Sequence, residues 1–220
     1  MVKSANVDLD KAKVETKEPL HNDQSKWIGL HAIRWVDPSG KHRVWECADR
    51  KTRKGQVDAV AILAIVKRPG TEPHVLLVRQ FRPPAEKTMI ELPAGLVDKG
   101  EVGDDGVLRA AFRELHEETG YRSDNPGTSM HVASMSSIMY NDPGLTGANM
   151  RMCTMEVDLS KDAPDPIANP DEGEFIERYL VPLRSLGSEL EAFVKKGYGV
   201  DARLAHMAAG IDIGLNYATR

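Results

Sequence analysis

Runs of apolar residues in the middle of the chain predict buried β-strands. Residues 59–66 are almost all apolar, and residues 74–79 form a second run after the pair Pro69-Gly70. Short apolar runs on either side of such a pair are typical of strands joined by a turn. Four further strands are predicted at residues 89–92, 132–139, 150–157 and 175–181. We therefore expect a sheet in this part of the chain.

Two earlier runs predict a β-hairpin. Residues 31–36 and 42–47 are strand-like and are separated by Asp37-Pro38-Ser39-Gly40. This tetrapeptide suits a turn because Asp forms local side-chain bonds, Pro fixes φ and Gly tolerates positive φ. Residues 1–24 have charges of both signs and no continuous apolar run, which predicts a flexible arm. We expect an N-terminal β region at residues 25–56 and the main domain at residues 57–220.

Helical periodicity appears in the second half of the chain. Four apolar residues at spacing i, i+3, i+4 and i+7 predict a helix with one apolar stripe: Leu108, Ala111, Phe112 and Leu115. Gly120 suits the C-cap of this helix, and Asp104 or Asp105 suits its N-cap. Two more helices are predicted at residues 188–196 and 201–215. Because strands and helices mostly do not alternate, the expected fold class is a mixed α/β (α+β) domain.

Composition narrows the class of protein. The 220 residues carry a formal net charge of −4, and 41% of them are hydrophobic. This composition is typical of a globular domain and disfavours a nucleic-acid binder. No apolar run is long enough to span a membrane, and two cysteines are too few for a disulfide framework. We expect a cytoplasmic protein; the basic run at residues 50–54 is a solvated face or a weak nuclear-import signal.

Three glutamates of the central helix are candidate metal ligands. Glu114, Glu117 and Glu118 lie at i, i+3 and i+4, so they share one helical face. Like charges at this spacing repel each other, and the macrodipole disfavours negative charge near a helix C-terminus. A divalent cation would relieve the conflict, and oxygen ligands favour Mg²⁺ or Mn²⁺. The spacing alone leaves a metal site and a solvated acidic face equally open.

A longer motif surrounds this helix. Residues 95–101 read Gly-Leu-Val-Asp-Lys-Gly-Glu, and residues 113–121 read Arg-Glu-Leu-His-Glu-Glu-Thr-Gly-Tyr. The motif resembles the Nudix box. Eleven residues separate Glu101 from Arg113 where the family pattern has seven, so four extra residues are expected to enlarge the loop at residues 102–106. Counted back from Arg113, the box glutamate would instead be Asp105.

Further segments resemble the ADP-ribose pyrophosphatase branch of this family. They are residues 80–84, 91–95, 142–145 and 172–174, and the two tryptophans Trp27 and Trp45 resemble those of eukaryotic ADP-sugar diphosphatases. The resemblance implies a Nudix α/β/α sandwich with a mixed sheet, preceded by a β-hairpin region that dimerises. It also implies Mg²⁺-dependent hydrolysis of ADP-ribose, and possibly of other ADP-sugars, to AMP and ribose 5-phosphate. Alternatives are another nucleoside diphosphate derivative as substrate, or a catalytically silent module that senses ADP-ribose.

The resemblance implies roles for the residues that carry the chemistry. Glu114, Glu118 and the backbone carbonyl of Ala94 correspond to metal ligands. Glu117 binds a metal or holds a ligating water, and Glu174 activates water or completes the metal site. Glu172 is the second choice for the role of Glu174.

The same resemblance implies roles in substrate binding. Trp27 and Trp45 would sandwich the adenine ring, one from each subunit of a homodimer; the alternative is that they pack in a core. Trp35 has no counterpart and is expected to be a packing residue. Five other residues correspond to substrate contacts: Glu46, Arg50, Arg82, Leu96 and Asp142. Nothing in the sequence gives Cys47 or Cys153 a catalytic partner.

Overall fold

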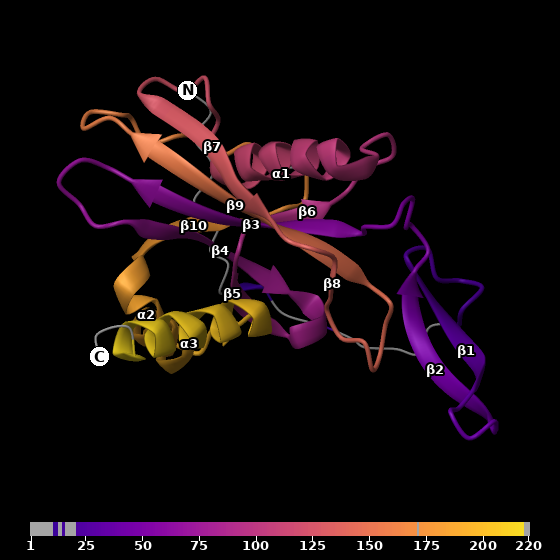
Figure 1. Ribbon diagram of the computed structural model, residues 1–220. Coiled ribbons are helices and arrows are strands. Elements are labelled where there is room, and N and C mark those ends of the chain that lie inside the picture. Colours follow the sequence, from indigo (N-terminus) through magenta and orange to yellow (C-terminus); the bar gives the residue numbers. More distant parts are fainter. Residues whose placement is uncertain (1–10, 13–14, 16–20, 171, 218–220) are drawn as a thin grey trace.

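The computed structural model describes residues 11–12, 15, 21–170 and 172–217. Its described residues form a two-stranded sheet and a separate nine-stranded sheet (Figure 1). The small sheet consists of β1 (Ile28–Val36) and β2 (His42–Arg50). The large sheet consists of β3 (Ala59–Lys67), β4 (His74–Arg82), β5 (Lys87–Glu91), β6 (Ala94–Leu96), β7 (Thr128–Met135), β8 (Met139–Tyr140), β9 (Asn149–Leu159), β10 (Glu177–Pro182) and β11 (Gly199–Val200). The helices are α1 (Gly103–Thr119), α2 (Leu186–Lys195) and α3 (Ala202–Tyr217), with single 3₁₀ turns at Pro83–Ala85 and Leu183–Ser185.

The large sheet is mixed. Its main path runs in the order β11-β5-β4-β3-β9-β7, while β10 pairs with β4, β6 with β3 and β8 with β9. The β3–β9 and β11–β5 pairs are parallel, and the other pairs are antiparallel. This arrangement confirms the predicted mixed α/β class.

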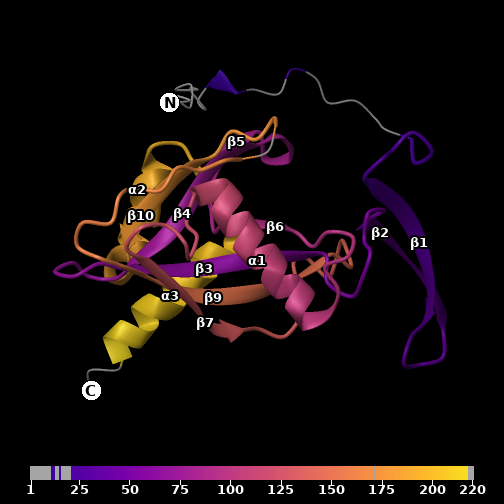
Figure 2. The ribbon, with the colours of Figure 1, turned by 90° about the horizontal axis from the view of Figure 1, so that it is seen from above.

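Helices cover both faces of the large sheet. Helix α1 lies on one face, and α2 and α3 lie on the other (Figures 1 and 2). One apolar core lies between the sheet and α1, and a second lies between the sheet and the pair α2 and α3. The central strand β3 contributes to both: Val60 and Ile62 pack in the first core, and Leu63 and Ile65 pack against the second. Burial on both faces explains why residues 59–66 read as a continuous apolar run instead of an alternating one.

The predicted hairpin is confirmed, and it projects from the side of the main body (Figure 1). Asp37 Oδ1 accepts hydrogen bonds from the backbone N–H groups of Ser39 and Lys41 at 2.9 and 3.0 Å, and Gly40 has φ of 83°. Most residues of the hairpin are exposed, including Trp35. The expectation that Trp35 packs in the interior is therefore not met within a single chain.

Helix α1 corrects two expectations. It begins at Gly103, so the extra residues add a helical turn and do not enlarge the loop. Four residues are close to the 3.6 of one turn, which lets the helix absorb them. Val102 is the N-cap residue, and Asp104 and Asp105 lie in the first turn instead. The predicted C-cap is confirmed, because Gly120 has φ of 80° and its N–H donates to the His116 carbonyl at 2.7 Å.

Most of the predicted arm, including residues 1–10, lies outside the described residues. The segment after β9 is rich in Asp, Glu and Pro, which predicts an exposed acidic loop, and it contains neither helix nor strand at residues 160–170 and 172–174. Within the described part of the chain, no helix is long and apolar enough to cross a membrane.

Candidate active site

Arg113 holds the two halves of the box motif together. Its guanidinium donates to Glu114 Oε1 at 2.8 Å and Glu117 Oε2 at 3.1 Å on its own helix. It also donates to Glu101 Oε2 at 3.2 Å and to the Leu96 carbonyl at 2.9 Å on the preceding segment. One planar group with several donors can satisfy these acceptors at once.

Glu101 and Asp105, the two candidates for the box glutamate, differ in their contacts. Glu101 accepts from Arg113 and from the Asp98 N–H at 2.7 Å, whereas Asp105 is exposed. Burial alone would raise the pKa of Glu101, but the bonds from Arg113 and Asp98 outweigh it and hold the pKa below its usual value. Glu101 thus stays ionised and fixes the position of Arg113.

The backbone at the start of β6 lies against the glutamates of α1. The Ala94 N–H donates to Glu118 Oε2 at 3.1 Å. A Cβ atom at Gly95 would lie 1.8 Å from the carboxyl group of Glu114, so only glycine permits this approach. The structure therefore brings together Ala94, Glu114 and Glu118, the three residues that the sequence suggested as metal ligands.

Burial makes the charges of these carboxylates costly. Burial raises the pKa of Glu118 to about 8, and the charges of Glu114 and Glu174 add to the rise. Burial also raises the pKa of Glu114, with contributions from Glu117 and Glu174. The charge of Glu174 thus acts on both residues. Carboxylate oxygens are hard donors, and a cluster of them fits Mg²⁺ or Mn²⁺.

The acidic loop that carries Glu174 is attached to the C-terminal end of α1. The Asn169 N–H donates to the Glu117 carbonyl at 2.9 Å. Arg178 donates to the carbonyls of Thr119 at 2.6 Å and Pro166 at 2.5 Å, which joins the helix end to the loop. Sequence reasoning did not single out Asn169 or Arg178, and no local pattern marks them, because their partners are distant carbonyl groups.

Arg82 lies near the carboxylate cluster. It pairs with Glu91 at 2.7 Å, and its positive charge opposes the rise in the pKa of Glu118, whose largest cause is burial. The positive charge of Arg82 can therefore attract an anionic group that is bound beside Glu118.

Three of the predicted substrate residues line one cavity. Trp27, Arg50 and Leu96 surround a volume of about 280 Å³. The Leu96 carbonyl is bound by Arg113, so this cavity borders the box residues. The Trp27 side chain is 67% exposed, which rejects the core-packing alternative for the single chain.

The other predicted substrate residues lie elsewhere on the same chain. Trp45 Nε1 donates to the Gly144 carbonyl at 2.9 Å, two residues after Asp142. Glu46 lines a separate cavity of about 380 Å³ with Leu145. The structure thus places three predicted substrate residues at the Trp27 cavity and three at the junction of β2 with the segment after β8, while Arg82 lies beside Glu91.

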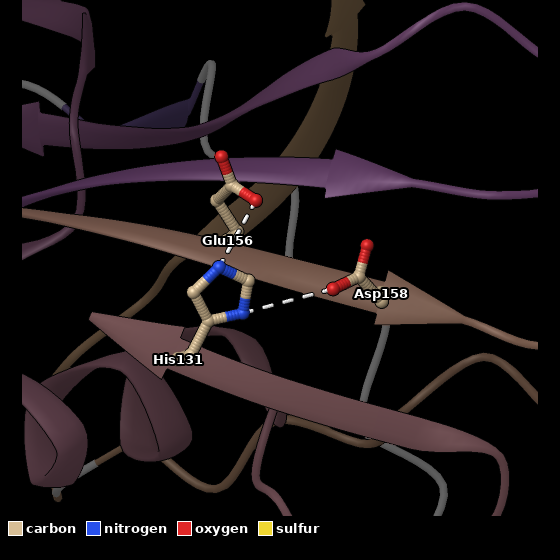
Figure 3. Close-up of side chains that lie close together, drawn as sticks. All are labelled: His131, Glu156 and Asp158. Atoms are coloured by element: carbon tan, nitrogen blue, oxygen red, sulfur yellow. Dashed lines mark ion pairs between the residues drawn. The ribbon is translucent and has the colours of Figure 1, made fainter. Parts of the chain in front are cut away.

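A second group of ionisable side chains lies on β7 and β9 (Figure 3). His131 lies 3.0 Å from Glu156 and 3.7 Å from Asp158. Lys67 also pairs with Glu156, so a cation already neutralises that carboxylate. The group is an ion-pair network across neighbouring strands and contains no residue of the box motif.

The family of the chain follows from comparison with known sequences. Residues 57–203 match the family model described as the NUDIX domain. The chain belongs to the Nudix family. The match starts close to β3 and includes α1 with all its glutamates. The predicted Nudix fold is thereby confirmed.

Three similar relatives extend over nearly the whole chain. An uncharacterized Nudix hydrolase of Schizosaccharomyces pombe is 48% identical over 209 residues, covering 94% of this chain and 96% of the relative. The ADP-ribose pyrophosphatase of Saccharomyces cerevisiae is 40% identical, covering 93% of this chain and 85% of the relative. The ADP-sugar pyrophosphatase of Mus musculus is 34% identical, covering 86% and 83%. The chain is a Nudix hydrolase.

Proposed function

We propose that this Nudix hydrolase cleaves the diphosphate bond of ADP-ribose, and of related ADP-sugars, in the presence of Mg²⁺. Water is consumed, and the products are AMP and ribose 5-phosphate. The observation that carries the proposal is the Trp27 cavity, whose lining residue Leu96 accepts a hydrogen bond from Arg113, the arginine that also binds Glu114. An exposed aromatic face beside an oxygen-ligand site suits a base attached to a diphosphate. The names of the yeast and mouse relatives support the same substrate class.

The carboxylate cluster supplies the groups that hydrolysis requires. Glu114, Glu118 and the Ala94 carbonyl would hold Mg²⁺, with Mn²⁺ as a substitute. A bound divalent ion neutralises phosphate charge and lowers the pKa of water. Glu174 or Glu117 accepts the proton of the attacking water; the support is that the charges of both carboxylates act on Glu114. Arg82 binds a phosphate oxygen beside Glu118.

On the substrate side, Trp27 stacks on the adenine while Arg50 and Leu96 flank it. We further propose a homodimer in which Trp45, Glu46 and Asp142 of a second copy complete the site. The support is the exposed hairpin: an isolated two-stranded sheet is marginally stable, yet this one exposes Ile33, Val44 and Trp45 to solvent. Large exposed apolar surface is typical of interaction sites.

The test is a steady-state assay with several diphosphates. ADP-ribose, ADP-glucose, a dinucleoside polyphosphate and 8-oxo-dGDP are compared with Mg²⁺ and with EDTA. We expect the highest kcat/KM for ADP-ribose, formation of AMP and ribose 5-phosphate in equal amounts, and loss of turnover in EDTA. A higher kcat/KM for the dinucleotide or the oxidised nucleotide would refute the substrate assignment. Full turnover in EDTA would refute the metal assignment.

A further inference from the structure

The Trp27 cavity adjoins a second, larger cavity. The second cavity has a volume of about 650 Å³ and extends along the segment that precedes α1. The two cavities share five lining residues: Lys54, Val57, Val97, Asp98 and Lys99. A base stacked on Trp27 therefore leaves unfilled space on the side of these two lysines.

The carboxylates that line the two cavities already have arginine partners. Asp58 pairs with Arg53 at 2.6 Å, in a buried position. Asp98 and Glu101 both pair with Arg113, at 3.5 and 3.2 Å. The remaining carboxylate, Asp104, pairs with Arg151. Each of these carboxylates thus has an arginine partner, and none of them pairs with either lysine.

Lys54 and Lys99 have no ion pair or side-chain hydrogen bond within the described part of the chain. A single exposed lysine of this kind is ordinary. Two of them line the same pair of cavities, beside Arg50, in a chain whose net charge is −4. A local excess of positive charge in a hollow attracts anions, and ammonium groups are suitable ligands for phosphate oxygens.

We propose that Lys54 and Lys99 form a subsite for an additional phosphate monoester on the nucleoside ribose of the substrate. The enzyme then accepts ADP-ribose that carries a phosphate at the 2′ or 3′ hydroxyl of its adenosine. This inference rests on the proposed function, because the adenosine must lie against Trp27. The extra phosphate is bound and not cleaved, so the hydrolysed bond is still the diphosphate.

The test uses the double variant Lys54→Gln/Lys99→Gln and a matched control, Lys161→Gln/Lys195→Gln, which removes two exposed charges elsewhere. The value of kcat/KM is measured for ADP-ribose and for 2′-phospho-ADP-ribose with saturating Mg²⁺. We expect the wild type and the control to hydrolyse both substrates. In the double variant, the ratio of kcat/KM for the phosphorylated to the plain substrate should fall about tenfold, the scale of one charge-assisted hydrogen bond.

A ratio that is unchanged in the double variant would overturn the subsite, as would a wild type that hydrolyses ADP-ribose but not its phosphorylated form. If the wild type hydrolyses neither compound, the proposed function fails, and binding still tests the subsite. Calorimetry with adenosine 2′,5′-bisphosphate and AMP should then show tighter binding of the bisphosphate, an advantage lost only in the double variant. Equal affinity for the two nucleotides would contradict the inference. Circular dichroism confirms that each variant is folded.

Discussion

Replacement of Glu118 by glutamine should stabilise the metal-free protein while abolishing hydrolysis. Glu118 is 4% exposed and shares its surroundings with the charges of Glu114 and Glu174. Glutamine has nearly the same shape, and its amide oxygen can still accept the hydrogen bond from the Ala94 N–H. The substitution therefore removes a buried negative charge with little change in packing.

The effect depends on pH in a defined direction. The ordinary pKa of 4.5 applies to the unfolded chain, and burial raises the folded-state pKa of Glu118 to about 8. The folded state consequently binds a proton more tightly, and linkage requires that stability falls as pH rises between these two values. Below about pH 4.5 the residue is protonated in both states and there is no penalty, whereas above about pH 8 the penalty is complete.

The size of the penalty follows from the same shift. At about 1.4 kcal/mol per pKa unit, the ionised carboxylate costs the folded state roughly 4–5 kcal/mol as an upper limit. For a chain of this length, each kcal/mol changes Tm by about 2–4 °C. In EDTA at pH 9, Glu118→Gln should thus melt about 10 °C above the wild type, and near pH 5 most of the difference should vanish.

Thermal unfolding in EDTA and in Mg²⁺, across this pH range, measures both consequences. Mg²⁺ should raise the Tm of the wild type at pH 8 and leave that of Glu118→Gln nearly unchanged, because a ligand stabilises only the state that binds it. Glu189→Gln, on the exposed side of α2, controls for the loss of one charge. A Tm difference in EDTA that is equal at pH 5 and pH 9 would refute the buried-charge argument. Equal stabilisation of both proteins by Mg²⁺ would refute the assignment of Glu118 as a ligand.

The remaining predictions concern the substrate, the acidic loop, the hairpin and the box loop. Trp27→Ala should raise KM for ADP-ribose about tenfold with little change in kcat, and Glu114→Gln should mainly lower kcat, as steady-state kinetics will show. Arg178→Met should lower kcat by about tenfold at constant KM, with partial rescue by Arg178→Lys, because the loop of Glu174 loses its bonds to the Thr119 and Pro166 carbonyls. Light scattering should give about twice the chain mass of 24.3 kDa, and a fully active monomer would contradict the dimer. Gly106→Ala should lower Tm, because the new Cβ would lie 2.1 Å from the Glu101 carbonyl carbon. Without that contact, alanine would favour the helix over glycine by about 1 kcal/mol.

The sequence predicts best those features that local chemistry decides. The hairpin depends on a turn whose Asp37 bonds its own neighbours, and the end of α1 depends on the positive φ of Gly120. The apolar run of β3 reflects burial on both faces. The box glutamates share a face because helical geometry is regular. Each of these follows from residues within a few positions of one another.

Features that depend on distant contacts could not be predicted in this way. Arg178 holds the acidic loop through carbonyl groups 59 and 12 residues away, and any residue type can supply a carbonyl. The hydrogen bond from Trp45 to the Gly144 carbonyl likewise joins residues that lie 99 positions apart. The residue pattern therefore identifies the candidate side chains, but only the three-dimensional structure shows which of them line the same cavity.

The box motif is four residues longer than the family pattern, and sequence and structure together explain how the fold accommodates them. The sequence reveals four extra residues, and the structure shows that they form the first turn of α1. From Gly106, where the Glu101 backbone touches the helix, seven residues lead to Arg113, a rise of about 10 Å. Helical side chains point back toward the N-terminus, and arginine and glutamate are long enough to meet across that distance. Their bond is present at 3.2 Å, so the insertion lengthens the helix while the contact that fixes Arg113 beside Glu114 is retained. The close approach at Gly106 makes this possible, because any side chain there would push Glu101 away from the helix.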